Sequence, residues 1–207
     1  MTIQSIIING IGATLAILTH EYSKGVAAHT LGDASIKSTG RLSLNPAKHI
    51  DPLGLIFMAI FRFGWGKPTR INMFSFREKR KSLAMLFLVP FLANIIMGIF
   101  MIILARFWLG NVLINNPTNI NFYILAGLEM AAWFNLSFAL FNLLPIYPLS
   151  GILLLNAASP HAALKITQYE KILQLILAFL IIFNIMYSIF TPITNRILQG
   201  LLNTMPF

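Results

Sequence analysis

The chain has 207 residues, of which 57% are hydrophobic and 10% are charged. A soluble domain carries about 25% charged residues, so this composition excludes an ordinary soluble protein and indicates a membrane protein with several spans. The absence of cysteine excludes disulfides and thiolate metal sites. The net charge of +9 does not indicate nucleic-acid binding, because seven of the fifteen Lys and Arg residues fall within residues 62–81, a pattern typical of a cytoplasmic loop.

Residues 3–31 predict the first membrane span, in which no charged residue precedes Glu21. A charge at the centre of a bilayer costs about 2.5–3.5 kcal/mol on insertion scales, so the charged residues Glu21 and Lys24 are candidates for function. Positions 20 and 24 lie about 40° apart on a helix and therefore share one face. This is the spacing of the two histidines in the His-Glu-x-x-His zinc motif, with His20 retained and Lys24 in place of the second histidine.

The chain becomes polar over residues 32–52, and residues 41–44 alternate between polar and apolar. This alternation predicts a small β-hairpin after the first helix. Residues 53–61 are apolar but too short for a span, which needs about 20 residues. They predict either a short re-entrant segment that enters the membrane and returns or an amphipathic helix on the membrane surface.

Three further apolar runs have the length of a span: residues 82–109, 122–144 and 173–193. Pro90 predicts a break within the second span, and two prolines end the third span within residues 145–151. The third span also holds Glu129, which either reaches toward the membrane surface or pairs with a basic neighbour; the sequence assigns it no role.

The sequence therefore predicts an all-α polytopic membrane protein with about four transmembrane helices, a short re-entrant segment and a small β-hairpin after the first helix. We expect one membrane-embedded domain over residues 1–207, with the N-terminus outside. Under this topology the end of the first span and residues 145–151 lie on the same, cytoplasmic side.

Several motifs in the chain follow a recognisable order. They are His20-Glu21, then residues 40–46 (GRLSLNP), 49–54 (HIDPLG), 63–68 (FGWGKP), 90–94 (PFLAN) and 141–151 (FNLLPIYPLSG). Together they extend from about residue 18 to residue 152 and resemble the site-2 protease family of intramembrane zinc metalloproteases.

The resemblance implies one Zn²⁺ held by two histidines and an aspartate, with a glutamate as general base. His20 stands at the first ligand position and Glu21 at the base position, whereas Lys24 and Ser150 stand at the other two ligand positions. Catalytic zinc needs three protein ligands and one open position, and a protonated lysine has no lone pair to donate. Zinc binding is therefore expected to be lost, and His49 is the one histidine that could substitute as a ligand.

Glu21 and Lys24 are spaced to form an ion pair within one helical turn, which would balance the charge without a metal. Under the simplest interpretation, His20 is a hydrogen-bonded core residue and this pair is structural. The resemblance further implies that Asn94 and Asn142 line a groove that holds substrate, although both asparagines could equally join helices through hydrogen bonds.

The predicted function is that of a pseudoprotease without a cofactor, a non-catalytic member that binds or holds a membrane partner helix. The alternative is an active zinc metalloprotease with an altered ligand set that includes His20 and His49. A third hypothesis is a transport or proton-relay role built on Glu21 and Lys24. The expected partners are membrane lipid and a transmembrane client protein or an active relative, in a bacterial inner (plasma) membrane.

Overall fold

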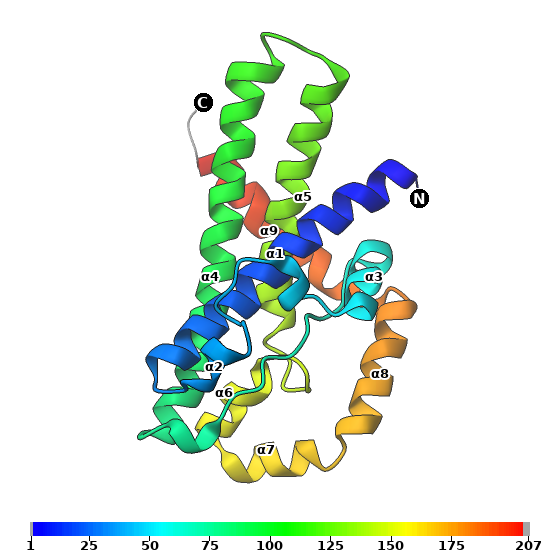
Figure 1. Cartoon of the computed structure of the whole chain (residues 1–207). Coiled ribbons are helices and arrows are strands. Elements are labelled where there is room, and N and C mark those ends of the chain that lie inside the picture. The colour runs from blue at the N-terminus through cyan, green and yellow to red at the C-terminus, as the bar shows by residue number, and fades with distance from the viewer. Residues whose placement is uncertain (1, 205–207) are drawn as a thin grey trace.

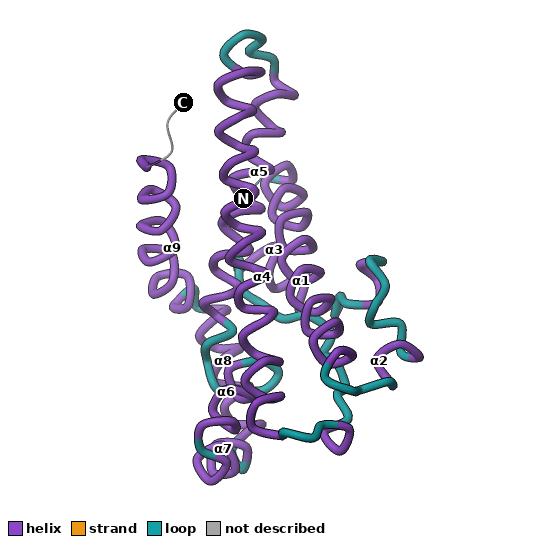
Figure 2. Tube along the Cα trace, turned by 90° about the vertical axis from the view of Figure 1, so that its left-hand side faces the viewer, coloured by secondary structure: helices purple, strands orange, loops and turns teal. Residues whose placement is uncertain are grey.

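The structure is a computed structural model that describes the backbone of residues 2–204 and the side chains up to residue 200. The described residues form helices and turns, without a strand (Figures 1 and 2). Three helices are long and apolar enough to cross a membrane: α1 (Ile3–Thr30), α4 (Lys79–Trp108) with its π-helical extension η3 (Leu109–Leu113), and α5 (Asn119–Phe141). The first three predicted spans are therefore confirmed as helices of the length and composition of a span, which is consistent with an integral membrane protein.

The three spanning helices pack on one another, with α4 and α5 antiparallel and α1 crossing both (Figure 1). Small residues allow this close approach. At Gly12 of α1, a Cβ would lie only 2.9 Å from the ring of Phe134 on α5, so a larger residue would push the two helices apart. On the other side of α5, a Cβ on Gly98 of α4 would lie 2.8 Å from the Leu136 side chain. The three helices thus form a compact scaffold around α5.

The fourth predicted span, residues 173–193, is not one straight helix. It is divided into α8 (Glu170–Ile182) and α9 (Ile185–Thr204), which meet at a bend of 70°. Asn184 at the bend has a φ of 56°, a left-handed conformation that ends a right-handed helix. The described residues therefore hold three candidate spans, or four if the bent pair crosses as one.

The break predicted at Pro90 does not occur, because α4 continues through this residue. Proline removes one backbone hydrogen bond, and such a loss is tolerated in a membrane helix where neighbouring helices pack against it. Pro90 is buried in this way. Two short helices, α6 (Gly151–Ala158) and α7 (Pro160–Thr167), then connect α5 to α8 along the lower edge of the molecule in Figure 1.

The β-hairpin predicted within residues 32–52 is corrected by the structure, which has helical turns there: α2 (Ser35–Ser38) and η1 (Pro46–Lys48). The Asp33 carboxylate accepts from the backbone N–H groups of Ser35 (3.0 Å) and Asn72 (2.7 Å), so this segment is attached to the chain before α4 and not to a partner strand. The Arg41 guanidinium turns inward and donates to two carbonyls of the chain after α3. Arg41 is thus held by a distant segment of the chain and not by a partner strand.

The predicted re-entrant segment is the helix α3 (Pro52–Phe61) followed by an immediate return of the chain. The return begins at Arg62, which has a φ of 65°. After it, the Lys67 N–H donates to the His49 carbonyl at 2.8 Å, so the two ends of the segment lie side by side. The Asn9 side chain donates to the Ala59 carbonyl at 3.1 Å and holds the far end of α3 against α1. The chain then passes through η2 (Met73–Ser75) to α4.

The return after α3 depends on a close backbone approach that can be tested by Gly64→Ala. A Cβ at this position would overlap the Gly54 carbonyl oxygen and the Met58 side chain, so we expect a loss of about 1–3 kcal/mol in stability, the usual cost of overpacking. The measurement is thermal unfolding in detergent. Gly127→Ala is the matched control, since a Cβ there meets nothing within 4 Å, and equal melting temperatures for the two variants would contradict this account.

Candidate functional site

The charged motif of α1 is buried inside the protein. His20, Glu21 and Lys24 are 1%, 4% and 5% exposed, respectively. The structure brings to them Asn94 from α4 and Ser150, which directly precedes α6 and lies 130 residues from His20 in sequence. The residues that the sequence analysis selected as ligand positions therefore meet in one polar cluster, together with Asn94.

The orientation of the Asn94 amide determines which ring nitrogen of His20 carries the proton. The Asn94 Nδ2 group donates to the Ala16 carbonyl and to Asn135 Oδ1, both at 3.0 Å, so its Oδ1 faces His20 as an acceptor. His20 Nδ1–H therefore donates to Asn94 Oδ1 at 3.0 Å. In the neutral ring, Nε2 then carries the lone pair, and the Ser150 hydroxyl donates to it at 2.8 Å.

Ser150 is itself held in place by the end of α5. Its backbone N–H donates to Asn142 Oδ1 at 3.0 Å, and Asn142 Nδ2 donates to the Phe138 carbonyl at 2.9 Å. Gly151 follows, where a Cβ would overlap the carbonyl oxygens of the preceding turn. The turn over residues 145–151 is therefore pinned against α5, which presents the Ser150 hydroxyl to His20.

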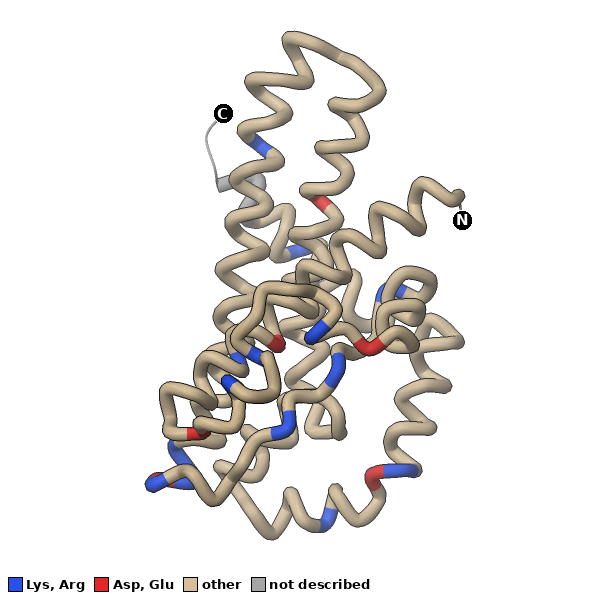
Figure 3. The backbone as a smooth tube through the Cα atoms, viewed as in Figure 1, with Lys and Arg blue, Asp and Glu red and all other residues tan. Residues whose placement is uncertain are grey.

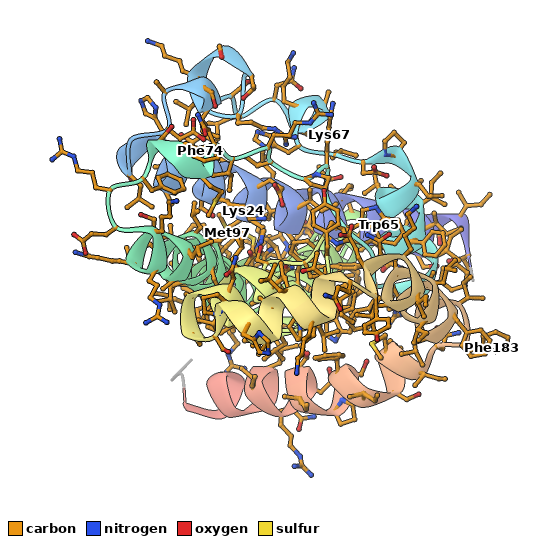
Figure 4. The ribbon with its side chains drawn as sticks, turned by 90° about the horizontal axis from the view of Figure 1, so that it is seen from below. Lys24, Trp65, Lys67, Phe74, Met97 and Phe183 are labelled. Atoms are coloured by element: carbon orange, nitrogen blue, oxygen red, sulfur yellow. The ribbon has the colours of Figure 1, made fainter. Side chains whose placement is uncertain are left out.

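The second half of the cluster is an ion pair. Lys24 Nζ lies 3.0 Å from Glu21 Oε1, and Thr69 donates its hydroxyl to the other carboxylate oxygen, Oε2, at 2.8 Å. Thr69 lies three residues after Gly66. The backbone at Gly66 approaches α1 so closely that a Cβ there would lie 3.1 Å from Glu21 Cγ. Figure 4 shows Lys24 within the helical packing, with Trp65 and Lys67 on the segment that leads to Thr69. Both oxygens of the carboxylate at the base position are thus occupied.

His49, the candidate substitute ligand, is not brought to His20. Its Nε2–H donates to the Ser43 carbonyl at 2.6 Å, and its ring contacts Tyr22 with centroids 6.5 Å apart. Tyr22 lies about 200° around α1 from His20, on a different face of the helix. Within the part of the chain that the structure describes, no three His, Cys, Asp or Glu side chains come together as a metal site. The residues present do not fit a zinc ion.

Ser150, His20 and Asn94 are hydrogen-bonded in the same sequence as the serine, the histidine and the third residue of a catalytic triad. Here the hydroxyl of Ser150 is buried, and the Asn94 amide connects onward to Asn135, which in turn donates to the Ala131 carbonyl at 2.8 Å. In this conformation the three side chains form one closed hydrogen-bond network that joins α1, α4, α5 and the start of α6.

A comparison with known proteins identifies the family of the chain. Over 188 residues the chain is 30% identical to a Bacillus subtilis (strain 168) protein named "Putative zinc metalloprotease YwhC", and the alignment covers 89% of this chain and 80% of that protein. The chain belongs to the site-2 protease family. No family model matches the sequence, and no solved structure matches the structure. Membership of the site-2 protease family is therefore a property of this chain.

Two contributors to the cluster were not selected as site residues from the sequence. Thr69 lies directly after the motif at residues 63–68, but a single threonine in a loop carries no signal that it binds a carboxylate. Asn135 is a polar residue inside an apolar span, which is a signal, yet it does not say which neighbour the amide meets. Asn94 and Asn142 are both buried within the network, and their predicted role in lining a substrate groove stays a prediction.

The buried ion pair leads to a direct test, because Lys24→Ala would leave Glu21 as an uncompensated buried charge. We expect this variant to lose about 3–5 kcal/mol of stability, measured by thermal unfolding in detergent. The double variant Glu21→Gln, Lys24→Met should recover most of that loss. Lys81→Ala serves as the matched control, since it breaks a pair of the same spacing to Glu78 that is exposed. An unchanged melting temperature for Lys24→Ala would show that the pair has no structural role.

Proposed function

We propose that this protein is a pseudoprotease, a non-catalytic member of the site-2 protease family that holds a membrane partner helix without cutting it. The observation that carries the proposal is the hydrogen bond from Ser150 to His20 Nε2, which occupies the lone pair at the retained ligand position. The ion pair of Lys24 with Glu21 is a second argument. The Lys24 ammonium supplies beside Glu21 the positive charge that a metal ion would supply in an active member of the family.

Metal-dependent peptide hydrolysis needs a metal with an open position for water and a base that is free to accept a proton from that water. In this chain the base position is bound by Lys24 and Thr69, and two ligand positions carry side chains that do not coordinate zinc as histidine and aspartate do. The alternative of an active enzyme with His49 as a ligand finds no support in the geometry of His49.

We propose that side chains of the partner helix enter a cavity beside the closed cluster. A cavity of about 250 Å³ lies between the segment after α3, the turn before α6 and the helix α8. Its lining residues include Asp51, Trp65, Pro68, Tyr147, Pro148 and Leu177. Pro68 directly precedes Thr69, and Pro148 stands two residues before Ser150, so a segment bound there would lie next to the polar cluster. A partner of this kind is a transmembrane client or an active relative.

The distribution of charge supports the proposed location in a bacterial inner membrane. Most lysines and arginines lie in the half of the molecule that holds α2, α6 and α7, with few along the tall pair of α4 and α5 (Figure 3). This asymmetry is typical of a cytoplasmic side under the positive-inside rule. The bacterial source of the similar protein points in the same direction.

The proposal is tested by the zinc content of the purified protein, measured by elemental mass spectrometry after expression with excess zinc. The native chain should hold far less than one zinc per chain, because its donor set does not fit the ion. The double variant Lys24→His, Ser150→Asp should hold about one zinc per chain, because it restores three protein ligands to one site.

The matched control is Lys81→His, Ser159→Asp, which introduces the same two residues away from the cluster and should hold no more zinc than the native chain. One zinc per native chain would overturn the pseudoprotease proposal. Zinc in the control variant at the level of the double variant would show that the added side chains bind the ion nonspecifically.

A further inference from the structure

A second group of polar side chains lies apart from the His20 cluster, in a groove between α4, α5 and α9. Glu129 on α5 faces Asn195 and Gln199 on α9 across a cavity of about 300 Å³. Asn195 and Gln199 are four residues apart and so share one face of α9. The groove reaches Ala105 of α4, which lies about 16 Å along that helix from Asn94 at a rise of 1.5 Å per residue.

The polar side chains of this groove have no partner among the residues whose side chains the structure describes. Glu129, Asn195 and Gln199 are all exposed, and across residues 2–200 none of their side chains makes a hydrogen bond or an ion pair. In water such side chains would simply be solvated. A membrane span offers no such solvation, so an unpaired carboxylate there indicates either a functional contact or a missing partner.

The depth of Glu129 limits what that partner can be. It is the eleventh of the 23 residues of α5, so about 15 Å of helix separates it from the Asn119 end at a rise of 1.5 Å per residue. The hydrocarbon core of a bilayer is about 30 Å thick, which places the carboxylate near its centre and out of reach of cationic lipid headgroups. A cation at this depth has to be carried by a transmembrane segment.

We propose that the groove formed by Glu129, Asn195 and Gln199 binds a transmembrane helix of a partner protein that carries a lysine or arginine near its centre. The carboxylate neutralises the cation, and the two amides accept its remaining N–H donors through their carbonyl oxygens. The walls are apolar, and the small residues Ala105 and Ala132 allow a helix to approach closely.

The cations on the spanning helices α1 and α4 of a second copy of this chain are already paired, since Lys24 is buried in its pair with Glu21 and Arg106 also has a partner. Arg196 on α9 is exposed and directly follows Asn195 on the wall of the groove itself. The position of α9 is in turn fixed by the hydrogen bond between Ser137 and Thr194 at 3.0 Å, so the groove is held open by contacts that do not involve Glu129. The inference is independent of the function proposed for the His20 cluster.

The test uses the full chain in phosphatidylcholine vesicles with synthetic transmembrane peptides of leucine and alanine. One peptide carries a central lysine and a second carries a central leucine, and association is measured by energy transfer between fluorescent labels. The lysine peptide should bind the native protein about five-fold more tightly or better, the range expected for a polar contact between membrane helices. Equal binding of the two peptides would overturn the proposal.

Two variants define the site in the same assay. Glu129→Gln should remove the preference for lysine, whereas Glu170→Gln, which removes a half-buried carboxylate at the start of α8, should retain it. Glu129→Lys should prefer a peptide with a central glutamate, so the charge reversal provides a readout that does not depend on a loss of binding. A preference for lysine that persists in Glu129→Gln would assign the contact to another part of the surface.

Discussion

The polar cluster depends on the requirement that polar groups inside a membrane protein find partners within the protein itself. Asn94 meets this requirement for several helices at once. Its amide donates to Ala16 on α1 and to Asn135 on α5, and its oxygen accepts from His20. This arrangement leaves one lone pair on the imidazole, which the Ser150 hydroxyl then fills. A single amide orientation thus determines what the retained histidine is able to bind.

Much of the scaffold follows from sequence because the signals are local. Long apolar runs predict four spans, of which three are single helices in the structure and the fourth is the bent pair of α8 and α9. The short run at residues 53–61 predicts a re-entrant segment or a surface helix, and the structure shows a short helix from which the chain returns. Within the site, the pairing of Glu21 with Lys24 follows from a spacing of three residues on one helix. The family resemblance adds the position of Ser150, since it aligns the turn at residues 145–151 with a known ligand position.

Other features depend on contacts that no local pattern encodes. The alternation at residues 41–44 resembles a strand, but Arg41 turns inward to carbonyls about 26 residues away. The bend at Asn184 results from one left-handed residue in a run that is otherwise apolar enough for a continuous span. The same holds for Thr69, whose hydroxyl reaches Glu21 only because α3 returns the chain to α1.

The buried pair of Glu21 and Lys24 also limits which substitutions the cluster can accept. Replacing Lys24 by histidine alone would remove the cation that balances Glu21, and replacing Ser150 by aspartate alone would add a second carboxylate beside the same single lysine. Each first step toward a metal site therefore strands a buried charge before any ion can compensate for it. Positions 21, 24 and 150 are therefore coupled through charge, so that a change at one of them is tolerated only together with a compensating change at another.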